Sequence, residues 1–124
     1  MKRDTESVEI ETEKVDVDEL DHLSSLSDTC NGQAFNFMAE SDNEIVVKDV
    51  LIKGSGIGHC FVYDKTRDVV LDACMGQFSV GPDFGAWDGD THPYAVDFEE
   101  VREWESEEEF VEFYENAPEN DFIL

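Results

Sequence analysis

Two apolar segments joined by a short charged turn occupy the centre of the chain. The segment GHCFVYDKTRDVVLDAC, residues 58–74, has β-branched and aromatic residues on both sides of Asp-Lys-Thr-Arg at 64–67. Four residues is a common length for a β-hairpin loop, so this segment predicts two antiparallel strands. An earlier β-branched run at 45–52 predicts another buried strand. These strands indicate a mainly antiparallel sheet.

Helices are predicted before and after these strands. Residues 18–26 carry leucines at helical spacing, and Ser-Asp-Thr at 27–29 is typical of the cap of a helix that has Cys30 in its first turn. Ser106 and Glu109 have the spacing of a capping box and predict a C-terminal helix. The order predicts an α+β fold in which the helix that bears Cys30 packs on the sheet.

The other segments are less regular. Residues 1–25 are predicted to form an acidic edge strand or a loosely attached arm, followed by the short helix, and residues 26–124 to form a single domain. The stretch 75–93 is rich in Gly, Pro and Asp and predicts a long loop. Short strands are predicted at 77–80, 94–98 and 100–104.

The net charge limits the partners that this chain can have. Asp and Glu number 32 against eight Lys and Arg, which gives a formal charge of −24. Nucleic acid and anionic lipid would be repelled, so we expect neither as a partner. The acidic residues gather at 1–22 and 99–121, whereas residues 45–80 are balanced. Few lysines beside a normal aromatic core favour adaptation to a salt-saturated cytoplasm, in a haloarchaeal or haloviral setting.

The cysteine count argues against a disulfide scaffold. Cys30, Cys60 and Cys74 are odd in number, and no pair has zinc-knuckle spacing. The N-terminus lacks an apolar leader, and no apolar run approaches the ~20 residues of a membrane span. We therefore expect a cytoplasmic protein, cellular or virus-encoded, with at least one free thiol.

The register of the predicted hairpin brings two polar residues together. If the loop is 64–67, His59 lies directly opposite Asp72, with Cβ atoms roughly 4.5–5.5 Å apart on one face. A slip of one residue would separate the faces, whereas a shift of two would make the pair diagonal. Burying an aspartate in an apolar strand is costly without a partner, and His59 is the partner that this register offers.

Cys30 is the third member of this predicted group. A thiol in the first turn of a helix is expected to have a lowered pKa, and a neighbouring histidine would lower it further and accept its proton. A cysteine in a helix is also commonly a small core residue, so the residue alone is ambiguous. Cys60 is expected to point to the other face from His59, and Cys74 is a second choice of thiol.

Two further groups are weaker candidates. Phe84 and Trp87 look exposed and are candidate substrate-binding residues. Asp88, Asp90 and His92 stand at alternate positions and contain oxygen ligands that hard cations favour. An acidic turn in an acidic protein explains this spacing more simply, so we expect no metal and no other cofactor.

Three short motifs together resemble the papain-like superfamily, in particular its small transglutaminase-like and phage-type cysteine hydrolases. They are TCNGQAF at 29–35, GHCFVY at 58–63 and VVLDACMGQF at 69–78. The resemblance implies a papain-like fold in which Cys30 is the nucleophile, His59 the general base and Asp72 the residue that orients the base. The sequence departs from the pattern at Phe61, where a tryptophan is expected, and at 73–74, where proline and a hydroxyl residue are expected. No glutamine precedes Cys30, so the oxyanion would be bound by N–H groups at the helix start.

Two classes of function follow from these observations. The first is a thiol-dependent acyl-transfer enzyme, a peptidase, amidase, deamidase or transglutaminase-like protein, with a protein or peptide substrate. The second is a catalytically silent papain-like interaction or viral structural protein, of which an acidic DNA mimic is the extreme form. The spread of acidic residues over both ends of the chain weighs against mimicry. The oligomeric state has no signal in the sequence.

Overall fold

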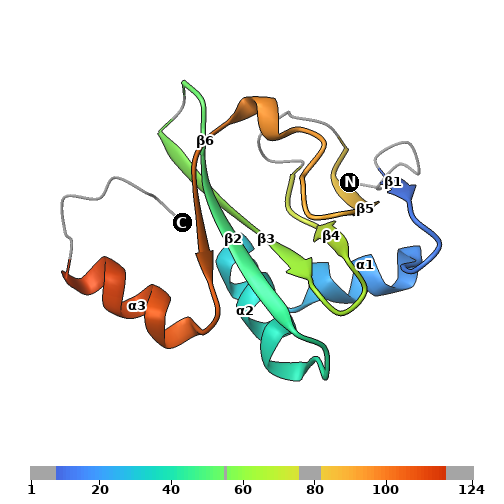
Figure 1. Ribbon diagram of the computed structural model, residues 1–124, viewed down its shortest axis with the longest axis horizontal. Coiled ribbons are helices and arrows are strands. Elements are labelled where there is room, and N and C mark those ends of the chain that lie inside the picture. Colours follow the sequence, from blue (N-terminus) through green and yellow to red (C-terminus); the bar gives the residue numbers. More distant parts are fainter. Residues whose placement is uncertain (1–7, 55, 76–81, 117–124) are drawn as a thin grey trace.

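The computed structural model describes residues 8–54, 56–75 and 82–116 of the chain. Within them the fold is α+β, as predicted, with three α-helices and a six-stranded sheet (Figure 1). No helix in these ranges is both long and apolar enough to cross a membrane. In chain order the elements are β1 (Val8–Glu11), α1 (Val17–Ser25), α2 (Cys30–Glu40), β2 (Ile45–Ile52), β3 (Ile57–Asp64), β4 (Val69–Asp72), β5 (Phe84–Asp88), the 3₁₀ turn η3 (Ala95–Asp97), β6 (Phe98–Trp104) and α3 (Glu107–Asn116).

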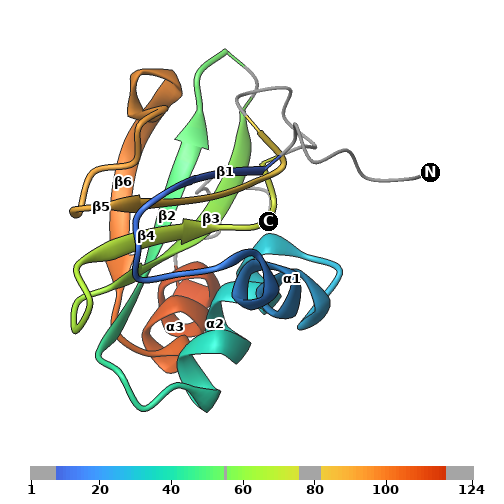
Figure 2. The same ribbon diagram turned by 90° about the vertical axis from the view of Figure 1, so that its right-hand side faces the viewer.

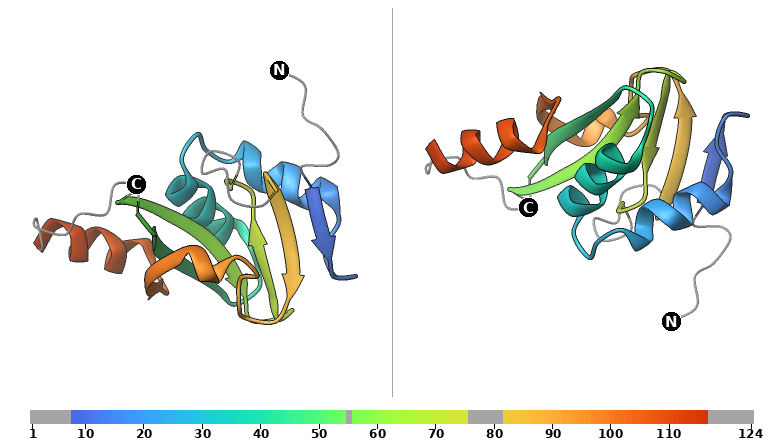
Figure 3. Two further views of the ribbon diagram at one scale, coloured as in Figure 1. Left: turned by 90° about the horizontal axis from the view of Figure 1, so that it is seen from above. Right: turned by 90° about the horizontal axis from the view of Figure 1, so that it is seen from below.

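The sheet has the strand order β1-β5-β4-β3-β2-β6. All neighbours are antiparallel except β1 and β5, so the mainly antiparallel sheet is confirmed. Of the two predictions for the N-terminal part, the edge strand is correct, because β1 pairs with β5 along its whole length. The edge strands are β1 and β6. β1 lies at one end of the molecule, and α3, which follows β6, lies at the other (Figure 3).

Each face of the sheet has its own apolar cluster. The three helices are grouped on one side of the sheet (Figure 2), where Leu20 and Phe35 pack with Val62. The opposite face holds a smaller cluster that includes Phe61, Trp87 and Phe98. Because strand residues alternate between faces, neighbours in β3 contribute to different clusters.

The predicted helix starts are confirmed. Thr29 caps α2 by accepting a hydrogen bond from the Gly32 N–H over 3.1 Å, which makes Cys30 the first helical residue. At α3, the Ser106 hydroxyl accepts the Glu109 N–H over 3.2 Å. The Glu109 carboxylate in turn accepts the Glu105 N–H over 3.1 Å, so both side chains satisfy N–H groups at this helix start.

The hairpin loop is shifted by one residue from the prediction. Asp64 pairs with Val69, so the loop is 65–68 rather than 64–67, and the register between β3 and β4 moves by two. Asp64 stays in the strand because its buried carboxylate accepts both the backbone N–H and the Nε–H of Arg67, over 3.0 and 2.8 Å. Asp68 completes the turn in the left-handed region, at φ 58°.

The segment predicted as a long loop contains a strand. β5 pairs with both β4 and β1, and Phe84 and Trp87 within it are 3% and 4% exposed. Both rings therefore belong to the core, and their predicted exposure is wrong. The predicted strand at 77–80 lies outside the described residues.

The two strands predicted at 94–98 and 100–104 are one strand, β6, preceded by η3. The Ala95 N–H donates to the carbonyl oxygen of His92 over 3.1 Å, and the Tyr94 N–H donates to the His92 ring. These hydrogen bonds form a turn in the chain before Phe98, where pairing with β2 begins.

Candidate active site

Cys30 lies where the start of α2 meets β3. Its side chain is buried, and the Cys60 N–H donates to its Sγ over 3.3 Å. Pairing between β3 and β4 covers Val62 to Asp64 of β3, so Cys60 lies beyond the paired stretch and its N–H meets the helix instead. The helix start and the hairpin are therefore in direct contact, which the sequence motifs alone left open.

His59 and Asp72 form a buried pair. The distance from His59 Nε2 to Asp72 Oδ2 is 2.7 Å, and the two side chains are 1% and 0% exposed. The two-residue shift of the hairpin makes them diagonal rather than directly opposite, but it keeps them on one face. The predicted partnership is confirmed although the predicted register is wrong.

A second histidine shares the same carboxylate. The Nε2 atom of His92 lies 2.9 Å from Asp72 Oδ2, and the Cys74 N–H donates to Oδ1 over 3.1 Å. Sequence reasoning placed His92 in a different group and missed this contact. The signal that pointed toward it is the buried carboxylate itself, which can accept more hydrogen bonds than His59 supplies.

The electrostatics favour an ion pair between Cys30 and His59. Burial alone would lower the pKa of His59, but the charge and hydrogen bond of Asp72, with a further contribution from Cys30, raise it to about 9. Burial would raise the pKa of Asp72, but the charge and hydrogen bond of His59, together with His92, lower it to about 2. Asp72 is therefore an anion that accepts the Nε2–H of His59.

The three cysteines have opposite roles in this cluster. Hydrogen bonds with Cys60 and Cys74 lower the pKa of Cys30 well below its ordinary value, burial opposes this, and His59 lowers it further. The same hydrogen bonds to Cys30, with burial, raise the pKa values of Cys60 and Cys74. No disulfide joins the three described cysteines. The directions of these pKa shifts make Cys30 the most acidic of the three thiols, and Cys60 and Cys74 the thiols that keep their protons.

The alternative metal group is not assembled. His92 points inward to Asp72, whereas Asp88 is largely exposed and accepts a hydrogen bond from Thr12 over 2.7 Å. Among the described residues, no group of three or more His, Cys, Asp or Glu side chains is arranged to hold a metal ion.

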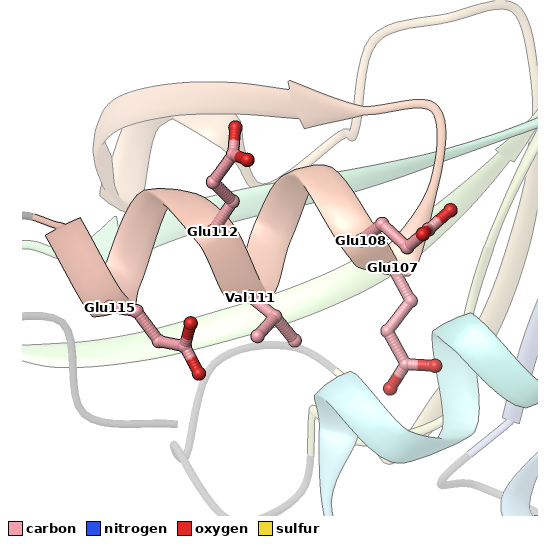
Figure 4. Close-up of a pocket in the computed structure, with 5 residues that line it drawn as sticks. All are labelled: Glu107, Glu108, Val111, Glu112 and Glu115. Carbon is pink, nitrogen blue, oxygen red and sulfur yellow. The ribbon is translucent and has the colours of Figure 1, made fainter.

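A hollow on the surface of α3 lies apart from this cluster. Figure 4 shows its lining, which consists of Val111 and four glutamates, Glu107, Glu108, Glu112 and Glu115. The lining of this hollow includes none of Cys30, His59 and Asp72.

Comparison with known proteins adds no relative: no family model matches the chain, and no match was found among curated proteins or solved structures.

Proposed function

We propose that this chain is a papain-like cysteine hydrolase or acyltransferase in which Cys30, His59 and Asp72 act as nucleophile, base and orienter. The observation that carries the proposal is the convergence of three distant segments on one buried point. A helix-start thiol accepts the Cys60 N–H, and the adjacent His59 is bonded to Asp72 over 2.7 Å. A core cysteine needs no histidine and carboxylate in series behind it.

In this proposal each nitrogen of His59 has its own role. Nε2 carries the proton that it donates to Asp72, which leaves Nδ1 to take the proton of Cys30. The Cys30 sulfur then attacks the carbonyl carbon of an ester or amide, and His59 returns the proton to the departing alcohol or amine. Water or a second amine, deprotonated by His59, attacks the thioester and releases the thiol.

The oxyanion of the tetrahedral intermediate requires N–H donors beside Cys30. Gly32 and Gln33 donate their N–H groups to the side chain and carbonyl of Thr29. The N–H groups of Cys30 and Asn31 precede the hydrogen bonds of the helix, and in this proposal they bind the oxyanion.

The working conditions that we propose are those of a salt-rich cytoplasm. The chain carries 32 acidic residues, and α3 alone presents four glutamates around one surface hollow (Figure 4). Salt would screen the repulsion among them, so assays belong in molar KCl.

The proposal is tested by the pH dependence of thiol alkylation. Iodoacetamide is applied between pH 4 and 9 in about 2 M KCl, and the alkylated peptides are identified by mass spectrometry. At this salt concentration the Debye length is ~3 Å or less, so repulsion between surface carboxylates is screened. We expect Cys30 to react first and to remain reactive well below pH 8, while Cys60 and Cys74 do not. The Cys74→Ser variant is the matched control: its hydroxyl can still donate a hydrogen bond to Cys30, so Cys30 should keep its reactivity.

Acyl transfer is tested with a small activated ester, p-nitrophenyl acetate. We expect a burst of nitrophenol and one acetyl group on Cys30, neither of which occurs in Cys30→Ser. If Cys30 reacts with iodoacetamide no faster than in the urea-unfolded chain, and no acetyl-enzyme forms, the proposed function is wrong.

A further inference from the structure

We propose that His92 is a positioning residue that holds the Asp72 carboxylate in the orientation that His59 requires. This inference deepens the proposed acyl-transfer function and rests on it. It assigns a role to a histidine outside the Cys30, His59 and Asp72 motifs, from a segment that is distant in the sequence.

The tautomer of His92 follows from its two hydrogen bonds. The Tyr94 N–H donates to Nδ1 over 3.1 Å, so Nδ1 is an acceptor and carries no proton. The ring proton is then on Nε2, which lies 2.9 Å from Asp72 Oδ2. His92 is therefore a donor to the carboxylate, and a backbone hydrogen bond fixes it in that state.

Three segments fix the carboxylate of Asp72. His59 and His92 both donate to Oδ2, and the Cys74 N–H donates to Oδ1 over 3.1 Å. Rotation of the carboxylate about its terminal bond would break contacts on both oxygens at once. The orientation of the His59 ring depends on its hydrogen bond to Oδ2. His92, which donates to the same oxygen, therefore also helps to fix His59 beside Cys30.

The surroundings of His92 keep this donor in place. Its ring centroid lies 4.7 Å from that of Phe61, 4.9 Å from Phe98 and 5.0 Å from Trp87. The side chain is 1% exposed, so water does not compete for Asp72. A ring that served only to fill space would not need its two nitrogens directed at a backbone N–H and a buried carboxylate.

Loss of this donor has a defined electrostatic consequence. The groups that act on Asp72 are His59 from β3, His92 before η3 and the Cys74 N–H, and the charge of Asp72 in turn helps to raise the pKa values of the Cys60 and Cys74 thiols. Burial raises the pKa of Asp72, whereas His59 first and His92 next hold it down to about 2. Without His92, Asp72 takes up a proton at higher pH. The neutral carboxyl no longer stabilises the His59 cation, and without that cation the Cys30 thiolate is less stable.

The test compares His92→Gln with His92→Phe. The Nε2 amide of glutamine can occupy the place of the imidazole Nε2 and keep a donor, whereas phenylalanine fills the aromatic enclosure without one. The rate of Cys30 alkylation is measured from pH 2 to 8, with thermal melting at each pH as the control for folding. We expect the acid limb of His92→Phe to move up by about one pH unit, a roughly tenfold loss of rate on that limb, and that of His92→Gln to stay near wild type.

The outcomes separate this inference from the proposed function. If wild-type Cys30 is not activated, the proposed function is wrong. If Cys30 is activated and the folded His92→Phe variant keeps the wild-type acid limb, or if His92→Gln shifts it equally, only the role of His92 is wrong. A second measurement needs no variant: ¹⁵N NMR of labelled histidine should show His92 with a bare Nδ1 and a protonated Nε2, and the opposite tautomer would overturn the inference.

Discussion

Replacing Cys30 with serine should change how the stability of the protein depends on pH. In the folded chain, hydrogen bonds with Cys60 and Cys74, and then His59, hold the pKa of Cys30 well below its ordinary value against the effect of burial. In the unfolded chain the thiol has the ordinary pKa of a free cysteine, about 8.5. Between pH 4 and 6, the wild-type chain therefore takes up one proton on Cys30 when it unfolds.

The sign and size of the effect follow from this one proton. A depressed folded pKa gives stability that is present above the unfolded pKa and is lost as pH falls toward the folded one. One proton corresponds to about 1.4 kcal/mol per pH unit, so lowering the pH from 6 to 4 should cost wild type about 2.7 kcal/mol more than Cys30→Ser.

The titration of His59 limits the pH range in which the contribution of Cys30 to the pH dependence of stability can be measured. Its pKa is raised to about 9 in the folded chain, chiefly by Asp72 against the effect of burial, so below pH 6 it is protonated in both states and adds no slope. The raised pKa of His59 gives stability that is full below about pH 6.5 and declines as pH rises toward 9. Between these values the rising contribution of Cys30 offsets this decline, so the wild-type curve should be nearly flat there.

The assay is urea unfolding followed by tryptophan fluorescence, in molar KCl at half-unit steps of pH. Cys74→Ser is the matched control. The pKa of Cys74 is raised by its hydrogen bond to Cys30 and by burial, so its thiol is protonated in both states, and the serine hydroxyl can still donate to Cys30; the variant should therefore parallel wild type. The 32 carboxylates are common to all three proteins and cancel in the comparison. Parallel curves for wild type and Cys30→Ser would mean that folded Cys30 is a neutral thiol, and the ion pair would be refuted.

Further predictions concern contacts around the sheet. His59→Gln should slow the alkylation of Cys30 at pH 6 at least about tenfold; an unchanged rate would show that the hydrogen bonds with Cys60 and Cys74 activate the thiol without His59. Tyr114→Phe removes a 2.6 Å hydrogen bond to buried Asp49 and should lower the free energy of unfolding by about 1.5–3 kcal/mol, whereas a loss below about 0.5 kcal/mol would contradict the contact. A Cβ at position 85 would overlap Cη2 of Trp87. Gly85→Ala should therefore lower the free energy of unfolding by about 1–3 kcal/mol and alter the tryptophan fluorescence. A wild-type fluorescence spectrum would show that the ring does not lie over Gly85.

The parts of the site that the sequence predicts are those set by local rules. A hydroxyl cap at Thr29 predicts a helix that begins with Cys30, and the structure has that start. Strand side chains alternate with a period of two, so His59 and Asp72 share a face in either of two registers. The shift itself came from the contact of Asp64 with Arg67, a side-chain bond that loop length alone does not encode.

The parts that were not predictable depend on distant neighbours. The composition around Phe84 is typical of a loop, yet the segment becomes a strand because β1 and β4 flank it. Gly85 leaves the space that the Trp87 ring occupies, so a residue that commonly weakens a strand permits this one. His92 then reaches Asp72 from beyond this strand, and no periodicity connects residues 72 and 92.

Buried aspartates mark where distant segments are tied to this sheet. Asp49, Asp64 and Asp72 are each 0% exposed, although the chain carries 32 acidic residues that are otherwise suited to solvent. Asp49 accepts hydrogen bonds from the Trp104 indole N–H of β6 and the Tyr114 hydroxyl of α3. Asp64 accepts hydrogen bonds from the side chains of Asn43 and Arg67. Asp72 accepts hydrogen bonds from His59 and His92. Burying an unpaired carboxylate costs free energy, so each of these aspartates requires a hydrogen-bond donor from another part of the chain. The sequence singles out Asp72 in this way, whereas Asp49 and Asp64 were not predicted to be buried, and only the fold identifies all the donors. For Asp49 the donors hold α3 on the sheet, and for Asp72 they position the base beside Cys30.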